Sequence, residues 1–128
     1  MVSLPWWDDL WLKESLADFI AHFCLEKIRH QLKSTKFDSA MIWFRRRKVW
    51  GYNDDQMDAT THPIRGQVKN TSIAYSRFDG ITYAKGAACI RQLVFLVGEE
   101  KFGECLGRYF QKYKWKNAAL SDFISELS

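Results

Sequence analysis

The sequence predicts a mostly α-helical chain of about four to five helices. Three observations lead to this prediction. Apolar residues recur at three- and four-residue steps in successive segments, as they do along one face of a helix. Proline and glycine stand where helices commonly begin and end, at Pro5 and Gly98. The alternation typical of strands is almost absent, and no repeat or linker divides residues 1–128, so we expect a single unit.

The first helix is predicted from Pro5 to about Leu32. Pro5 suits a first helical turn, and Asp8 and Asp9 would face the positive end of the helix dipole. A short polar break is expected at residues 33–36. The apolar stripe of this helix comprises Leu12, Leu16, Phe19, Ile20, Phe23, Cys24 and Ile28.

The middle of the chain is predicted to contain two helices separated by a loop. The second helix begins with Asp38 or Ser39 as its cap, and Gly51 leaves its end undefined. Residues 58–73 are expected to be an extended loop, because their threonine, proline and glycine residues oppose a regular helix. A third helix is predicted over residues 77–97.

The C-terminal part of the chain is predicted to form two further helices. Gly98 is placed to end the third helix, and a fourth is expected over residues 99–113. A turn at residues 115–117 leads to a last short helix over 122–127, which Ser121 could cap.

The composition is that of a folded chain with a large share of aromatic residues. Hydrophobic residues make up 47% of the 128 residues and aromatic residues 16%, which excludes a disordered chain. Each aromatic ring requires roughly 150 to 250 Å² of cover. We therefore expect some rings to face solvent or a partner. No apolar run reaches the length of a membrane-spanning helix, so no membrane insertion is expected.

The three cysteines, Cys24, Cys89 and Cys105, indicate a reducing compartment. Their odd number and unpaired spacing argue against a disulfide framework. Because the N-terminus also lacks the pattern of a signal peptide, we expect a cytoplasmic location. Each cysteine lies among apolar residues at helical spacing, which predicts buried thiols.

The chain is basic, with a formal charge of +4 and a pI of about 9.0. The excess charge is concentrated at residues 45–48 and 101–116. Such clusters can bind nucleic acid or an anionic membrane, but they are more often the solvated face of a helix. No nucleic-acid-binding motif accompanies them, so we do not expect nucleic-acid binding.

One carboxylate lies in an aromatic-rich amphipathic stretch. Residues 6–18, WWDDLWLKESLAD, place Glu14 on the first predicted helix. By itself such a glutamate is an ordinary surface residue. The stretch resembles the Trp-Leu-Asn-Glu segment of zinc metallopeptidases of the aminopeptidase N type, which are gluzincins, and the resemblance implies that Glu14 is the third zinc ligand. Lys13 and Ser15 depart from the Asn and Gly common in the family, and Lys13 could either weaken metal binding or point to solvent.

A second stretch, TYAKGA at residues 82–87, resembles the Tyr-x-Lys-Gly-Ala segment of the same family. The resemblance implies that Tyr83 donates a hydrogen bond to the oxyanion formed when the scissile carbonyl is attacked. A phenol suits this role because it stays protonated at neutral pH. By itself Tyr83 would be a half-buried residue at a helix start. His62 lies where the family has a Ser-His-Pro connector, and we expect it to brace the loop.

The resemblance covers nearly the whole chain from residue 6 onward, but no His-Glu-x-x-His motif occurs. It implies the helical half of a thermolysin-like catalytic domain, which in the intact family carries zinc and acts on peptides. A catalytic zinc takes three protein ligands and a water molecule. This chain offers only Glu14, since His22 and His30 do not form the missing pair. We therefore expect a fragment or truncated homologue that binds no stoichiometric zinc and is inactive alone.

A second hypothesis starts from the same missing motif. The chain could be a non-enzymatic helical interaction module that keeps the family's fold and has lost its chemistry. Its exposed apolar surface would then serve self-association or binding of a protein partner. The sequence leaves both hypotheses open.

Overall fold

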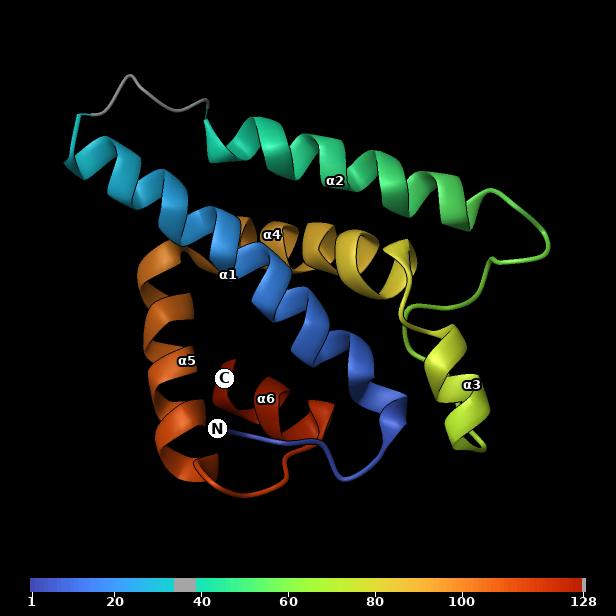
Figure 1. The fold of residues 1–128 in the computed structure, drawn as a ribbon. Helices are drawn as coiled ribbons and strands as arrows, with labels where there is room; N and C mark the ends of the chain where they lie inside the picture. Colours follow the sequence, from blue (N-terminus) through green and yellow to red (C-terminus); the bar gives the residue numbers. More distant parts are fainter. Residues whose placement is uncertain (34–38, 128) are drawn as a thin grey trace.

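The computed structural model describes residues 1–33 and 39–127, which form helices joined by turns and one long loop (Figure 1). In chain order the elements are η1 (Trp7–Asp9), α1 (Leu10–Gln31), α2 (Ala40–Asp55), α3 (Thr71–Ser76), η2 (Ile81–Lys85), α4 (Gly86–Val97), α5 (Glu99–Tyr113) and α6 (Leu120–Leu127). The η1 element is a 3₁₀ turn, and η2 is π-helical. No strand occurs among the described residues, which confirms the mostly α-helical prediction.

Helix α1 is the central element of the fold. It packs against α4, η2 and α2, while α5 packs against α4 and α6 (Figure 1). The N-terminus lies beside the turn that follows α5, where the Trp115 N–H donates to the Met1 carbonyl at 2.6 Å (Figure 1). The buried core residues come from α1, α2, α4, α5 and α6 and include Leu12, Leu16, Phe19, Phe44, Ala87, Ile90, Val94, Phe102, Cys105, Tyr109 and Phe123.

Small side chains bring α1 very close to the junction of η2 and α4. The Ser15 hydroxyl is fully buried and donates to the Thr82 carbonyl at 2.7 Å. A Cβ atom on Gly86 would lie 2.0 Å from Ser15 Oγ, which no side chain there can tolerate without a shift. The lack of a Cβ at Gly86 therefore sets the distance between the two segments that carry Glu14 and Tyr83.

Helix α2 approaches η2 in the same way. A Cβ on Gly51 would lie 2.9 Å from the Gly80 carbonyl oxygen, and the Asp54 carboxylate accepts the Gly80 N–H at 2.7 Å. Lys85 Nζ is 2.6 Å from Asp55 Oδ2. These contacts explain why α2 continues through Gly51, which the sequence pattern did not resolve, and ends at Asp55.

The N-terminal segment is fastened by two neighbouring carboxylates. Asp9 is buried and accepts from Arg65 Nε at 2.8 Å and from the Leu120 N–H at 2.9 Å. Asp8 accepts the Val68 N–H at 2.6 Å. Both residues lie in the first turn of η1, which runs directly into α1, so they stand at the start of the helix as expected, although α1 itself begins at Leu10 and the carboxylates bind distant segments.

Several predicted boundaries are corrected by local contacts. The predicted loop ends early, because the Asn70 side chain accepts the Ile73 N–H and starts α3 at Thr71. The predicted third helix begins later, as η2 followed by α4. Ser121 lies inside α6 rather than at its cap. Ser39 caps α2 and Gly98 ends α4, as predicted, while residues 34–36 of the expected break and Asp38 lie outside the described residues.

Burial follows the predicted stripe only in the first half of α1. Leu12, Leu16 and Phe19 are buried, whereas Ile28 is 48% exposed. The prediction of three buried thiols holds for Cys105 alone, since Cys24 and Cys89 are exposed and all three are free. Within the described part of the chain, no helix has both the length and the apolar character that a membrane span needs.

We expect Asp9→Ala to destabilise the chain by about 2 to 4 kcal/mol, because the change leaves the Leu120 N–H without its acceptor and Arg65 without its partner. Urea unfolding followed by circular dichroism measures this change. The matched control is Glu100→Ala on the exposed first turn of α5, which should shift the free energy of unfolding by less than about 0.5 kcal/mol. Equal midpoints for Asp9→Ala and the unchanged chain would contradict the role given to Asp9.

Candidate functional site

Glu14 lies on α1, one residue before the close contact between Ser15 and Gly86. Its side chain is only 14% exposed, and Lys13 Nζ lies 3.1 Å from its Oε1 atom. Lys13 is itself 51% exposed. The lysine that replaces the family's asparagine thus reaches solvent and pairs with Glu14 at the same time.

Tyr83 comes from η2, and the structure brings it to Glu14. The Ser15 hydroxyl, next to Glu14, donates to the carbonyl of Thr82, next to Tyr83, at 2.7 Å, so the two segments lie against each other. Burial, followed by the nearby Glu14 carboxylate, raises the pKa of Tyr83 to about 12, while the cation of Arg47 acts in the opposite direction. The phenol is therefore protonated at neutral pH and acts as a donor. The π-helical turn widens the helix at this point, a geometry that recurs at functional sites.

Three further residues surround Tyr83 that sequence reasoning missed. The ring of Trp50 stacks on that of Tyr83, with centroids 6.0 Å apart and planes inclined by 28°. Arg47 lies over Trp50, its guanidinium carbon 4.5 Å from the ring centroid, and Arg47 Nε is 3.2 Å from Asp18 Oδ1. Asp18 lies one helical turn after Glu14 on α1, and Arg47 lies one turn before Trp50 on α2. This spacing was the only feature of the sequence that could have pointed to these residues.

His62 braces the long loop against the start of η2, as expected. Its Nε2 lies 2.6 Å from Asp79 Oδ2, and its Nδ1 lies 2.7 Å from the Pro63 carbonyl oxygen. The other oxygen of Asp79 accepts the Thr82 N–H at 2.9 Å. The loop, His62 and Asp79 together hold the turn that presents Tyr83.

The residues present do not by themselves fit a catalytic zinc ion. Within the described residues, no three His, Cys, Asp or Glu side chains lie close enough together to hold a metal. His22 Nδ1 lies 2.7 Å from the Asp18 carbonyl, and His30 Nε2 lies 3.1 Å from a Glu26 oxygen, so each has a partner in its own helix. Glu14 is thus a single candidate ligand without the two others that such a site requires.

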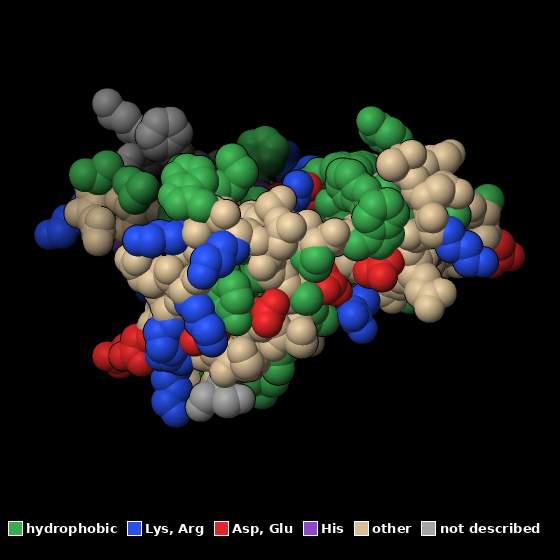
Figure 2. Space-filling model, turned by 90° about the horizontal axis from the view of Figure 1, so that it is seen from below, with side chains coloured by type: hydrophobic (Ala, Val, Ile, Leu, Met, Phe, Trp, Pro, Cys, Tyr) green, Lys and Arg blue, Asp and Glu red, His purple; other side chains and the backbone are tan. Residues whose placement is uncertain are grey.

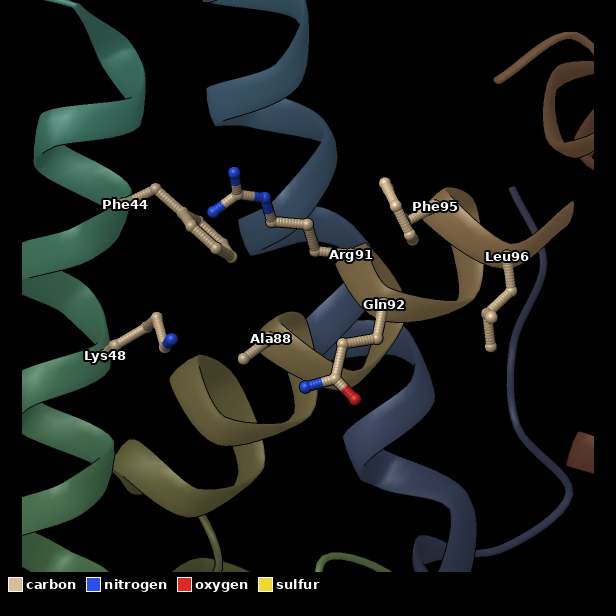
Figure 3. Close-up of a pocket in the computed structure, with 7 residues that line it drawn as sticks. All are labelled: Phe44, Lys48, Ala88, Arg91, Gln92, Phe95 and Leu96. Atoms are coloured by element: carbon tan, nitrogen blue, oxygen red, sulfur yellow. The ribbon is translucent and has the colours of Figure 1, made fainter. Parts of the chain in front are cut away.

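A surface hollow of about 390 Å³ lies between α2 and α4 (Figure 3). Lys48 projects toward it from α2 and Gln92 from α4, while Arg91 lies 5.6 Å from the centroid of the Phe44 ring (Figure 3). Neither Glu14 nor Tyr83 lines this hollow. Its position therefore does not mark the site that the sequence predicts.

Comparison with known proteins gives one consistent family. A model of the peptidase family M1 domain matches residues 1–128. Aminopeptidase N of Streptomyces lividans is 37% identical over 128 residues, which cover 99% of this chain and 14% of that protein. Probable aminopeptidase 1 of Sulfurisphaera tokodaii is 37% identical over 131 residues, covering 100% of this chain and 16% of that protein.

Mammalian proteins are similar over the same region. Glutamyl aminopeptidase of Mus musculus is 33% identical over 126 residues, covering 98% of this chain and 13% of that protein. The chain thus spans only between 13% and 16% of the length of these relatives.

We expect Glu14→Gln to lower the pKa of Tyr83 toward its usual value, because the change removes the negative charge that favours the protonated phenol. The measurement is an alkaline absorbance titration, from which the Tyr83→Phe titration is subtracted to isolate this phenol. Glu100→Gln on α5 is the control and should leave the pKa unchanged. An unaltered pKa in Glu14→Gln would exclude the contact.

The raised pKa of Tyr83 also makes the free energy of unfolding depend on pH. The folded chain keeps the Tyr83 proton above pH 10, where an unfolded tyrosine loses it. The contribution of the Tyr83 proton to the stability of the fold is therefore complete below about pH 10 and disappears as the pH rises toward about 12.

Proposed function

This chain belongs to peptidase family M1, and from that membership we propose that residues 1–128 form one unit of a zinc aminopeptidase catalytic domain, the part that follows the His-Glu-x-x-His motif. The family is zinc-dependent and acts on peptides. The activity that we propose for the complete domain is removal of N-terminal residues from peptides.

The observation that carries this proposal is the close approach of the segments that carry Glu14 and Tyr83, where the Ser15 hydroxyl donates to the Thr82 carbonyl at 2.7 Å. The two residues lie far apart in the sequence, on α1 and η2, and they are the two that the family motifs single out. The close packing of Ser15 on Gly86 holds their segments together. A chance likeness of two short motifs would not require their key side chains to meet.

The role proposed for Tyr83 follows from its protonation state. A phenol with a pKa of about 12 remains a hydrogen-bond donor throughout the neutral range. Donors that are already oriented toward a developing negative charge lower the barrier of acyl transfer, and the loss of one typically costs about 100- to 1000-fold in kcat. We assign Tyr83 to the oxyanion and Glu14 to the metal.

The 128 residues alone are proposed to be inactive. They contain no His-Glu-x-x-His sequence, and the described residues do not bring three ligands together. The two histidines and the general base would have to come from another segment of polypeptide. A cytoplasmic location is part of the same proposal and rests on free cysteines at Cys24, Cys89 and Cys105.

The test has two parts, of which the first uses the purified chain. With added zinc, we expect no stoichiometric metal by mass spectrometry and no hydrolysis of alanyl or leucyl p-nitroanilides. Bound zinc together with turnover would overturn the inactivity of the isolated chain.

The second part joins the chain to the upstream segment of a family relative that carries His-Glu-x-x-His. The joined protein should hydrolyse these substrates, Glu14→Ala should abolish the activity, and Glu100→Ala should preserve it. Unchanged activity in Glu14→Ala would remove Glu14 from the site.

A non-enzymatic interaction module is the second candidate, and the exposed apolar surface favours it. Phe95 is 88% exposed, Leu96 78% and Leu32 72%. Figure 2 shows separate groups of hydrophobic side chains on one face of the molecule, with Lys and Arg side chains gathered beside them.

We expect an interaction module to form one defined monomer or dimer, whereas a catalytic-domain segment without its other half should aggregate through uncovered apolar surface. Sedimentation velocity of the purified chain over a range of concentrations distinguishes the two. A single sharp species would favour the module, and concentration-dependent heterogeneous assembly would favour the catalytic-domain segment. Phe95→Ser should reduce such assembly, and the exposed, charged Glu100→Ser serves as its control.

A further inference from the structure

We propose that Arg47 is a positioning residue for Tyr83: tied to Asp18, it holds the Trp50 ring against the tyrosine ring and so fixes the direction of the Tyr83 hydroxyl. This inference depends on the proposed function in one respect only, the catalytic role assigned to Tyr83. The arrangement itself joins two elements, α1 and α2, to the catalytic candidate on η2.

The first step is the fixed position of Arg47. Its Nε atom lies 3.2 Å from Asp18 Oδ1 and 3.3 Å from Oδ2, so the carboxylate receives the donor between its two oxygens. The Asp18 side chain is only 10% exposed, and Arg47 is 38% exposed. A pair that is largely shielded on the carboxylate side is screened less by water than an ion pair in open solvent.

The second step is the stack that Arg47 completes. The guanidinium lies 4.5 Å from the centroid of Trp50, within the range of cation–π attraction, and Trp50 in turn lies 6.0 Å from Tyr83. Phe78 contacts Tyr83 as well, at 6.4 Å and 45°. The tyrosine ring thus has aromatic neighbours from two segments, and only the one from α2 is held by a charge.

The third step is the close packing of the α2 backbone on the backbone that leads into η2. Beside Trp50, Gly51 lies so close to Gly80 that an added Cβ would be 2.9 Å from its carbonyl oxygen. The α2 and η2 backbones therefore pack closely here, and the Trp50 ring, with Arg47 over it, is the neighbour that α2 supplies to Tyr83. A misplacement of about 1 Å at a reacting centre can cost about 100-fold in rate.

Arg46 provides a matched comparison on the same helix. It also lies over a tryptophan, 4.9 Å from the centroid of Trp43, but Trp43 is 52% exposed and has no contact with Tyr83 among the aromatic pairs of the described residues. Removing this arginine takes away the same charge and the same kind of stacking. It leaves the neighbours of Tyr83 in place.

The experiment places 3-fluorotyrosine at position 83 alone and records its ¹⁹F resonance in the folded chain at neutral pH. We expect one resonance, displaced from that of the free amino acid by the neighbouring rings. Arg47→Met should lose at least half of this displacement, and Arg47→Lys, which can still pair with Asp18, should retain most of it. Arg46→Met should match the unchanged chain.

Circular dichroism verifies that each variant is folded. If Arg47→Met fails to fold, Asp18→Asn provides the test, because it removes the partner of Arg47 and leaves the arginine in place. An unmoved resonance in a folded Arg47→Met or Asp18→Asn chain would overturn the proposal.

The joined catalytic domain provides a second readout. Arg47→Met should lower kcat about 10- to 100-fold and change KM less than about twofold, because the arginine acts through Tyr83 and does not contact the substrate. A change confined to KM would overturn the proposal. If the unchanged joined domain is itself inactive, the proposed function fails, while the ¹⁹F result still decides the role of Arg47.

Discussion

The structure depends on the close approach of α1 to the junction of η2 and α4. The Ser15 hydroxyl occupies the space that a side chain on Gly86 would need, and it donates to the Thr82 carbonyl. Because the hydroxyl has a partner, a buried polar group costs little here, and because Gly86 has no Cβ, the two backbones can meet. Glu14 and Tyr83 lie on either side of this contact. Their meeting is therefore a consequence of core packing and does not require the two polar groups to attract each other strongly.

A second constraint is the set of long-range polar contacts that fasten segments without regular structure. Asp9 joins the start of α1 to the loop at Arg65 and to the start of α6 at Leu120, and His62 joins the same loop to η2 through Asp79. Each acceptor is largely shielded from water, so an unpaired partner would carry a desolvation cost. The long loop is thus held at His62 and at Arg65, although few of its residues are buried.

The sequence could predict the helices with strong periodicity and the caps at Ser39 and Gly98, while the roles of Glu14 and Tyr83 come from the family resemblance and stay predictions. It could not predict the π-helical turn of η2 or the continuation of α2 through Gly51, because both depend on contacts between α2 and η2 that no local pattern encodes. The partners of Asp9 could not be predicted for the same reason, since they lie far away along the chain. Within the site, Arg47 belongs to the basic run at residues 45–48, which resembles any solvated helix face, and Trp50 follows this run.

The π-helical turn at η2 has a consequence for how the chain can vary. An α-helix rotates by about 100° for each residue, and a π turn accommodates one residue more than an α turn would. Loss of a single residue from η2 would restore regular α-helical phase up to Gly86 and would swing Tyr83 by about that angle, away from Glu14. Helix α4 and its buried face would remain as they are. A chain without the extra residue in η2 would therefore keep the fold but lose the proximity of Tyr83 to Glu14.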